Sequence, residues 1–319
     1  MKINIWGSSI PFNTGKNKLE DMKIKKMPEL LLMFGMAKAT FGTKIVKDKT
    51  SFDSFTYEKA IKPGNEKKTY DDVPTITPFI SEGSDTAVVI APGGGFFYKE
   101  IDSEGYQRAK VLNEMGISAF VLDYRVNPYK APASSLDMQR AVRYVRYHAE
   151  EYGINPKKVG VMGSSAGGYV AASSALLLRD EVPDVEGYVP DEVDRESGKA
   201  SFLSLFYPVT GFYRNPSMLA ILAGDDFFHD GKRRKLQDDY SLQNHLEGKV
   251  PPVFLIYGDK DPLKDMLDFE KAMREKGLSI ETHVIPKASH GFSPIKDTAG
   301  LWRENYQKWL KRLFEQVKG

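Results

Sequence analysis

From about residue 86 onward, short apolar runs alternate with longer segments in which apolar residues recur every three or four positions. Apolar runs this short are typical of strands that are buried on both faces. They are Thr86–Ala91, Ile117–Tyr124, Val159–Met162, Phe202–Tyr207, Val253–Tyr257 and Ile280–Ile285. The segments predicted to be helices are Ser103–Met115, Leu136–Tyr152, Ala166–Leu178 and Leu301–Val317. Strands that alternate with helices predict βαβ units and a mainly parallel sheet.

Three stretches do not follow this alternation. Residues 1–72 are predicted to form an N-terminal extension, with a helix at Glu29–Phe41 and an edge strand at Phe52–Ile61. The α/β domain then covers residues 73–319. Within it, residues 180–199 and 211–245 are much longer than an ordinary connection in an α/β unit. Long connections of this kind commonly build lids and substrate pockets.

The composition narrows the chemistry. The chain has 319 residues, 41% of them hydrophobic and 28% charged, which is typical of a globular protein. Cysteine is absent, so thiol catalysis, zinc–thiolate sites and iron–sulfur clusters are excluded. No two of the five histidines lie within five residues of each other, which also excludes a His-x-x-x-His metal pair. We therefore expect no metal site.

Charge is unevenly distributed. Residues 1–70 contain 14 Lys and no Arg against 7 Asp and Glu, whereas the remainder carries a net charge of −5. A Lys-rich arm is compatible with an anionic partner, but a solvated surface explains it more simply. We expect no nucleic-acid partner. We also see no secretory signal and no apolar run long enough to span a membrane, so the sequence predicts a cytoplasmic protein.

The strongest motif is Gly163-Ser164-Ser165-Ala166-Gly167, which matches Gly-x-Ser-x-Gly. It directly follows one predicted strand and opens a predicted helix, which is the setting of a nucleophile elbow. The tight turn requires small neighbours two residues on either side of the serine, and Gly163 and Gly167 satisfy this requirement. Ser165 is therefore the candidate nucleophile. The simpler alternative is a Gly/Ser-rich loop that only packs a helix on a sheet.

A second motif, Pro92-Gly93-Gly94-Gly95-Phe96, directly follows the strand predicted at Thr86–Ala91. Three consecutive glycines leave backbone N–H groups accessible to a ligand. An acyl-transfer enzyme needs such donors for the oxyanion that forms during the reaction. A flexible turn or a phosphate loop would be the alternative, but neither Gly-Lys-Ser/Thr nor a complete Gly-x-Gly-x-x-Gly is present.

Two further motifs supply a base and an acid. Asp261 follows the strand predicted at Val253–Tyr257, and His290 follows the strand predicted at Ile280–Ile285. A serine hydroxyl needs a base to accept its proton, and the base needs a carboxylate to fix its tautomer. The chain order Ser165, Asp261, His290 is that of α/β hydrolases. Asp259 remains the rival for the acid, and the other histidines lie in predicted helix, strand or polar insertion.

On these motifs the sequence resembles the α/β-hydrolase esterases whose oxyanion loop reads Pro-Gly-Gly-Gly-aromatic, relatives of the hormone-sensitive-lipase-like group. The resemblance covers about three quarters of the chain. It implies Ser165 as nucleophile, His290 as base and Asp261 as its partner, with oxyanion donors at the amides of Gly94, Gly95 and Ala166. The hormone-sensitive-lipase-like pattern has His where this chain has Pro92. Proline cannot donate a hydrogen bond, so the loop must be held by other groups, and the choice among the three glycines as donors stays open.

The fold expected is therefore an α/β hydrolase, and the function expected is a serine carboxylesterase without cofactor. Its substrate would be a short-chain, acetyl-type ester of a sugar or a small alcohol. A prolyl-oligopeptidase-like peptidase and a non-catalytic binding protein of the same fold are the alternatives. The apolar helix expected at Glu29–Phe41 would cover the pocket, a second subunit of a homo-oligomer or a lipid surface, and the sequence leaves these three open.

Overall fold

The computed structural model describes residues 1–13, 72–127, 129–178, 180–292 and 300–315. The helix expected at Glu29–Phe41 and the strand expected at Phe52–Ile61 lie outside these residues.

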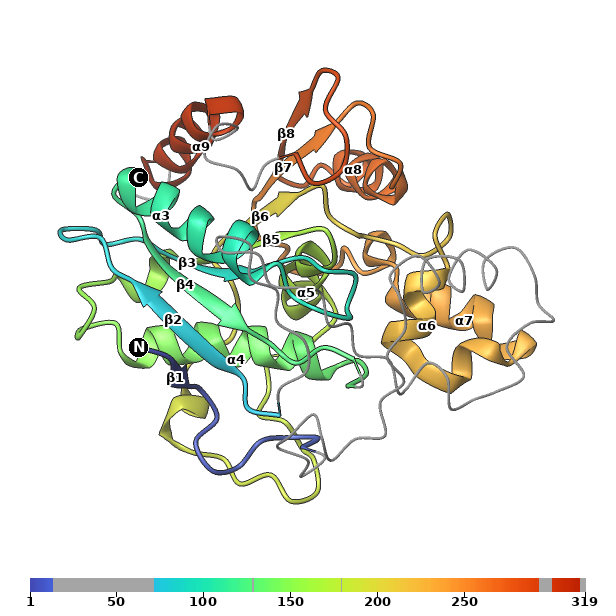
Figure 1. Cartoon of the computed structure of the whole chain (residues 1–319), viewed down its shortest axis with the longest axis horizontal. Helices are drawn as coiled ribbons and strands as arrows, with labels where there is room; N and C mark the ends of the chain where they lie inside the picture. The colour runs from blue at the N-terminus through green and yellow to red at the C-terminus, as the bar shows by residue number, and fades with distance from the viewer. Residues whose placement is uncertain (14–71, 128, 179, 293–299, 316–319) are drawn as a thin grey trace.

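The centre of the molecule is one eight-stranded sheet with the order β1-β2-β4-β3-β5-β6-β7-β8 (Figure 1). The strands from β4 to β8 in this order run parallel, and β1 and β2 are antiparallel to their neighbours. The strands are β1 (Ile3–Asn4), β2 (Thr75–Phe79), β3 (Ala87–Ala91), β4 (Ser118–Asp123), β5 (Val159–Ser164), β6 (Leu203–Phe206), β7 (Val253–Gly258) and β8 (Ile280–Ile285). All six predicted strands are present, and the α/β arrangement is confirmed.

Helices cover both faces of this sheet. In Figure 1, α3 and α9 lie side by side on one face, where Arg303 pairs with Glu114. α4 and α5 pack together on the other face, joined by the Ser135–Ser173 hydrogen bond. The α-helices are α3 (Gln107–Glu114), α4 (Ala133–Tyr147), α5 (Ala166–Leu176), α6 (Ser217–Ala223), α7 (Asp230–Tyr240), α8 (Asp265–Glu275) and α9 (Arg303–Glu315). Shorter turns are the π-helix η2 (Ile101–Tyr106) and the 3-10 turns η3 (Pro156–Lys158), η4 (Glu192–Arg195), η5 (Gly224–Phe228) and η6 (Leu242–Asn244).

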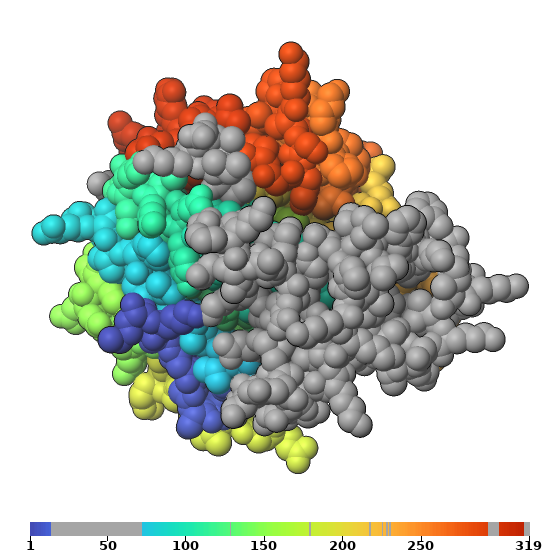
Figure 2. Space-filling model, in the orientation of Figure 1, coloured from blue at the N-terminus to red at the C-terminus, as the bar shows by residue number. Residues whose placement is uncertain are grey.

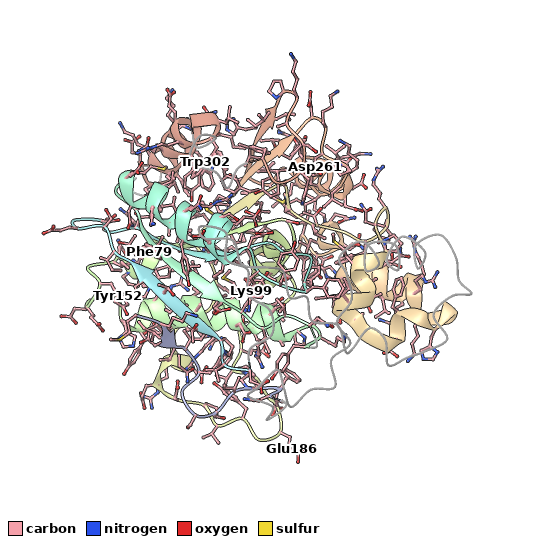
Figure 3. All side chains as sticks on the ribbon, viewed as in Figure 1. Phe79, Lys99, Tyr152, Glu186, Asp261 and Trp302 are labelled. Carbon is pink, nitrogen blue, oxygen red and sulfur yellow. The ribbon has the colours of Figure 1, made fainter. Side chains whose placement is uncertain are left out.

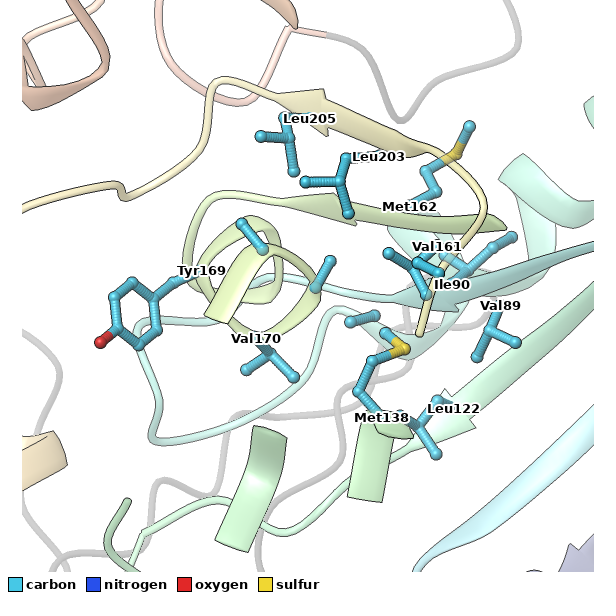
Figure 4. Packing of buried hydrophobic residues seen from close by; sticks show 14 of the residues in the cluster. Val89, Ile90, Leu122, Met138, Val161, Met162, Tyr169, Val170, Leu203 and Leu205 are labelled. Atoms are coloured by element: carbon cyan, nitrogen blue, oxygen red, sulfur yellow. The ribbon is translucent and has the colours of Figure 1, made fainter. Parts of the chain in front are cut away.

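The core lies between these layers, because β3 to β7 are buried along their whole length. Figure 4 shows the side chains of β3, β5 and β6 packed beside Met138 of α4 and Val170 of α5. One prediction is wrong here. The Ile280–Ile285 run forms β8, which lies at the edge of the sheet and is only partly buried, because nothing pairs with its outer side among the described residues.

The start of the predicted N-terminal extension contributes a short strand to the sheet, β1. Ile3 and Asn4 pair with Ile76 and Thr75. Trp6 is buried, and its indole N–H donates to Asp137. In the space-filling view these residues, in blue, lie directly against the cyan and yellow-green parts of the chain (Figure 2). The division into an extension and a catalytic domain at residue 72 stays a prediction.

The two insertions differ in how they are held. Residues 180–199 lie against α4, where Arg140 pairs with Asp191 and Asp194 and Arg143 pairs with Asp180. Residues 211–245 form α6, η5, α7 and η6, and α6 and α7 lie to one side of the sheet (Figure 1). No helix in the described part of the chain is long and apolar enough to cross a membrane.

Candidate active site

Ser165 lies at a sharp turn between β5 and α5, at the carboxyl edge of the sheet. Its backbone has φ 51° and ψ −123°, which an L-residue adopts only under strain. The turn is possible because glycines surround it. A Cβ on Gly163 would overlap the carbonyl of Gly167, and a Cβ on Gly167 would overlap the carbonyl of Ala91. The structure therefore contains the elbow geometry that the motif predicts.

His290 and Asp261 reach this serine from two other strand ends. The Nε2 atom of His290 lies 2.9 Å from Oγ of Ser165, and its Nδ1 atom lies 2.9 Å from Oδ2 of Asp261. Asp261, labelled in Figure 3, follows β7. It is fully buried, and its second carboxylate oxygen accepts the N–H of Leu263. The three side chains thus form one continuous hydrogen-bonded row, partly exposed at His290 and buried at Asp261.

The other candidates for base and acid do not join this row. Asp259 is exposed, and its backbone N–H donates to the Ile285 carbonyl of β8. His148 is paired with Glu151, and His283 is paired with Glu281. Among the described residues, Asp261 is the only carboxylate bonded to His290, and His290 is the only imidazole bonded to Ser165.

The loop Pro92–Phe96 lies against the elbow. A Cβ on Gly93 would be 2.8 Å from the Ser164 carbonyl and 3.0 Å from Cβ of Ser165, so the loop touches the serine turn. Gly94 has φ 140° and no room for a side chain, because a Cβ would overlap the Tyr98 carbonyl. This close approach requires glycine at both positions.

Some backbone groups of the loop are already hydrogen-bonded and anchor it, and the others are candidate oxyanion donors. The Gly93 N–H donates to the Glu104 carboxylate at 2.6 Å, and the Gly93 carbonyl accepts from Glu100 N–H at 2.9 Å. The amides of Gly94 and Gly95 have no acceptor within the described part of the chain. Ala166 opens α5, and the first N–H groups of a helix have no acceptor within the helix.

Tyr124 holds the loop at Pro92, the position where the related pattern has His. The hydroxyl of Tyr124, buried at the end of β4, donates to the Pro92 carbonyl at 2.6 Å. Burial, followed by the charges of Glu104 and Asp123, raises the pKa of Tyr124 far above its ordinary value, so the hydroxyl stays a donor. Tyr124 and Glu104 are the contacts that the sequence did not reveal, since a single buried Tyr or Glu within a helix or strand pattern carries no motif.

Aromatic rings pack together where α5 meets the second insertion. Tyr169 of α5 is buried, packs edge-on against Phe96 and Phe212, and donates its hydroxyl to the Tyr240 carbonyl. Burial raises the pKa of Tyr169 well above its ordinary value. Through Phe212 and Tyr240, the insertion of residues 211–245 therefore contacts α5, the helix that begins at the elbow.

A family model described as the α/β-hydrolase fold matches residues 88–294, which is more than half of the chain. The chain belongs to the α/β-hydrolase family. The match includes the glycine loop, the serine elbow, Asp261 and His290, so the motifs that carried the resemblance fall inside it.

Curated relatives of this hydrolase include an acetylxylan esterase from Xylanibacter ruminicola, 29% identical over 74% of this chain and 46% of that protein. The endo-1,4-beta-xylanase B of Butyrivibrio fibrisolvens is 28% identical over 73% of this chain and 37% of that protein. The chain thus spans less than half the length of these two relatives. Among solved structures, an acetyl ester-xyloside bifunctional hydrolase from Caldicellulosiruptor lactoaceticus is 31% identical with a TM-score of 0.64, over 77% of this chain and 89% of that one.

Proposed function

We propose that this hydrolase is a serine carboxylesterase that removes short acyl groups, acetyl above all, from esters of sugars or small alcohols. The observation that carries the proposal is the hydrogen-bonded row from Ser165 through His290 to Asp261. It lies next to amides that have no acceptor within the described residues. The names of two relatives, the acetylxylan esterase and the acetyl ester-xyloside hydrolase, support the acetyl group.

In the proposed reaction, Oγ of Ser165 attacks the ester carbonyl while Nε2 of His290 accepts the hydroxyl proton. Asp261 accepts the Nδ1–H hydrogen bond, fixes the imidazole tautomer and stabilises the imidazolium. The tetrahedral oxyanion is bound by the amides of Gly94, Gly95 and Ala166. His290 then protonates the leaving alcohol, and a water molecule repeats the sequence on the acyl-enzyme.

The names of the relatives support a short acyl group, because both specify acetyl esters. A sugar as the alcohol part of the ester is likewise supported by the names of these relatives, which refer to xylan and xyloside.

The test is turnover on p-nitrophenyl esters from acetate to octanoate, together with acetate release from acetylated xylo-oligosaccharides. We expect kcat/KM to be highest for acetate and to fall with chain length, and we expect acetate release from the oligosaccharide. Cleavage of a proline-containing peptide without ester hydrolysis would favour the peptidase alternative, and no turnover of any substrate would favour a binding protein.

A further inference from the structure

Glu104 is a buried carboxylate outside the row of Ser165, His290 and Asp261, and it is only 5% exposed. Its Oε2 atom accepts the Gly93 N–H at 2.6 Å, and its Oε1 atom accepts the Tyr207 hydroxyl at 2.8 Å. We propose that Glu104 is a positioning residue that fixes the oxyanion loop and the surroundings of His290 relative to each other. This role rests on the esterase function proposed above.

The first branch leads to the oxyanion loop. Gly93 is confined between Glu104 and the elbow, since a Cβ on it would lie 2.7 Å from Glu104 Oε2 and 3.0 Å from Ser165 Cβ. The amides of Gly94 and Gly95 follow directly in the chain. The anchor on the Gly93 N–H therefore sets the position of these donors relative to Oγ of Ser165.

The second branch leads to the base. Tyr207 follows β6 and has a positive φ of 37°, and its ring lies edge-on to the His290 imidazole with the centroids 5.0 Å apart. The same ring packs against Phe292, two residues beyond the histidine. Because the hydroxyl of Tyr207 is bound by Glu104, the ring that supports the imidazole is fixed to the same carboxylate as the loop.

A local irregularity of the helix brings Glu104 to this position. Ile101–Tyr106 is a π-helical turn that precedes α3, and such widened turns occur frequently at functional sites. Gly105 permits close packing here, because a Cβ on it would lie 2.7 Å from Val121 of β4. The turn begins directly after Glu100, whose N–H closes the loop on the Gly93 carbonyl.

The chemistry of the two donors explains why a carboxylate suits the position. The Gly93 N–H can only donate, whereas the Tyr207 hydroxyl can donate or accept. Alanine at position 104 would leave a buried N–H without an acceptor. Glutamine could still accept from Gly93 and donate to Tyr207, so Glu104→Gln retains the anchor in part.

The experiment compares Glu104→Ala and Glu104→Gln with Asp102→Asn, a matched control. Asp102 is an acidic residue on the same π-helical turn, but its side chain is only partly buried. For each variant, active sites are counted by titration with a fluorophosphonate, and kcat and KM are measured on p-nitrophenyl acetate per titrated site. The Ki of a trifluoromethyl ketone, whose serine adduct carries an oxyanion, gives a second readout.

We expect Glu104→Ala to lower kcat per titrated site by about 10- to 100-fold, because loss of one oxyanion contact costs about 100-fold or more and here the donors are only displaced. KM should stay within about threefold, since the oxyanion forms only in the transition state. The Ki of the ketone should rise by the factor by which kcat/KM falls. Glu104→Gln should lose less than Glu104→Ala, and Asp102→Asn should match the parent.

If Glu104 had a purely structural role, Glu104→Ala would lower the melting temperature or the number of titrated sites and leave kcat per site unchanged. That result would overturn the proposal. If Glu104→Ala does not fold, Glu104→Gln and Tyr207→Phe decide. A fall in kcat with unchanged KM in both supports the role, and parental kcat in both overturns it. A parent chain that hydrolyses no ester, or in which Ser165→Ala stays active, would instead overturn the proposed function and this role with it.

Discussion

The two sides of the candidate site are built differently. The serine elbow is enclosed by the core, and every residue from Val161 to Val170 except Ser165 is buried. The histidine loop, residues 286–292, follows the edge strand β8 and is exposed or only partly buried throughout. Backbone packing fixes the serine, whereas side-chain contacts orient the histidine: its hydrogen bonds to Asp261 and Ser165 and the ring of Tyr207. Substitutions of the buried residues that enclose Ser165 should therefore affect folding, whereas those on the histidine side should affect mainly chemistry.

The largest effect should come from the serine itself. Ser165→Ala should lower kcat on p-nitrophenyl acetate by a factor on the order of 10⁶, because no other hydroxyl reaches His290 Nε2 in the described structure. Little packing is lost, so the melting temperature should change only slightly.

Ser164→Ala is the matched control for that loss. The Oγ atom of Ser164 does not face His290, and it accepts from the buried Arg108 guanidinium at 2.7 Å. The variant should lose stability, about 1–3 kcal/mol for a buried donor deprived of this acceptor, yet keep kcat per titrated site within about tenfold. Equal losses of kcat from the two serine variants would contradict the role of Ser165.

On the histidine side, Asp261→Asn should lower kcat by about 10⁴-fold, because an amide favours the wrong imidazole tautomer. Asp259→Asn should stay within about twofold of the parent, since Asp259 is exposed and not bonded to His290. Steady-state kinetics on both variants measure the difference, and a larger loss from Asp259→Asn would transfer the acid role to that residue.

One glycine substitution on each side compares how strongly the two sides contribute to the free energy of unfolding. Gly167→Ala should cost about 3 kcal/mol or more and reduce the yield of folded protein, because its Cβ would overlap backbone carbonyls of Ala91 and Pro92. Gly291→Ala, next to His290, should cost only about 1–2 kcal/mol, for its φ of 77° in otherwise open space. Urea unfolding of both variants gives the two values, and equal costs would remove the contrast between the sides.

The sequence was informative where one residue type satisfies a steep physical requirement. Gly163 and Gly167 flank a strained serine and identify the elbow, and the apolar runs identify β3 to β7. It was less informative where a contact depends on tertiary packing.

β2 contains Pro78, which disfavours a strand, yet it is tolerated because β1 pairs only with Ile76 and Thr75. Trp6 and Ile3 carry no periodic pattern, so their place in the sheet and core could not be predicted. Glu104 lies in a π-helical turn that no sequence period marks.

The smallest effect that we expect concerns alkaline pH on the histidine side. Burial, and then the charge of and hydrogen bond to Glu270, raises the pKa of Tyr257 on β7 to about 12. The unfolded chain loses this proton near the ordinary tyrosine value of about 10, so above that pH the unfolded state is favoured. The stability contributed by the protonated tyrosine is complete below a pH of about 10 and is lost as the pH rises towards about 12.

Tyr257→Phe removes the group, so the fall in the free energy of unfolding between pH values of about 8 and about 10.5 should be smaller in the variant, by about 1 kcal/mol at most. Urea unfolding at the two pH values tests this, and an identical fall in parent and variant would show that the phenol's pKa is the same in the folded and unfolded chain.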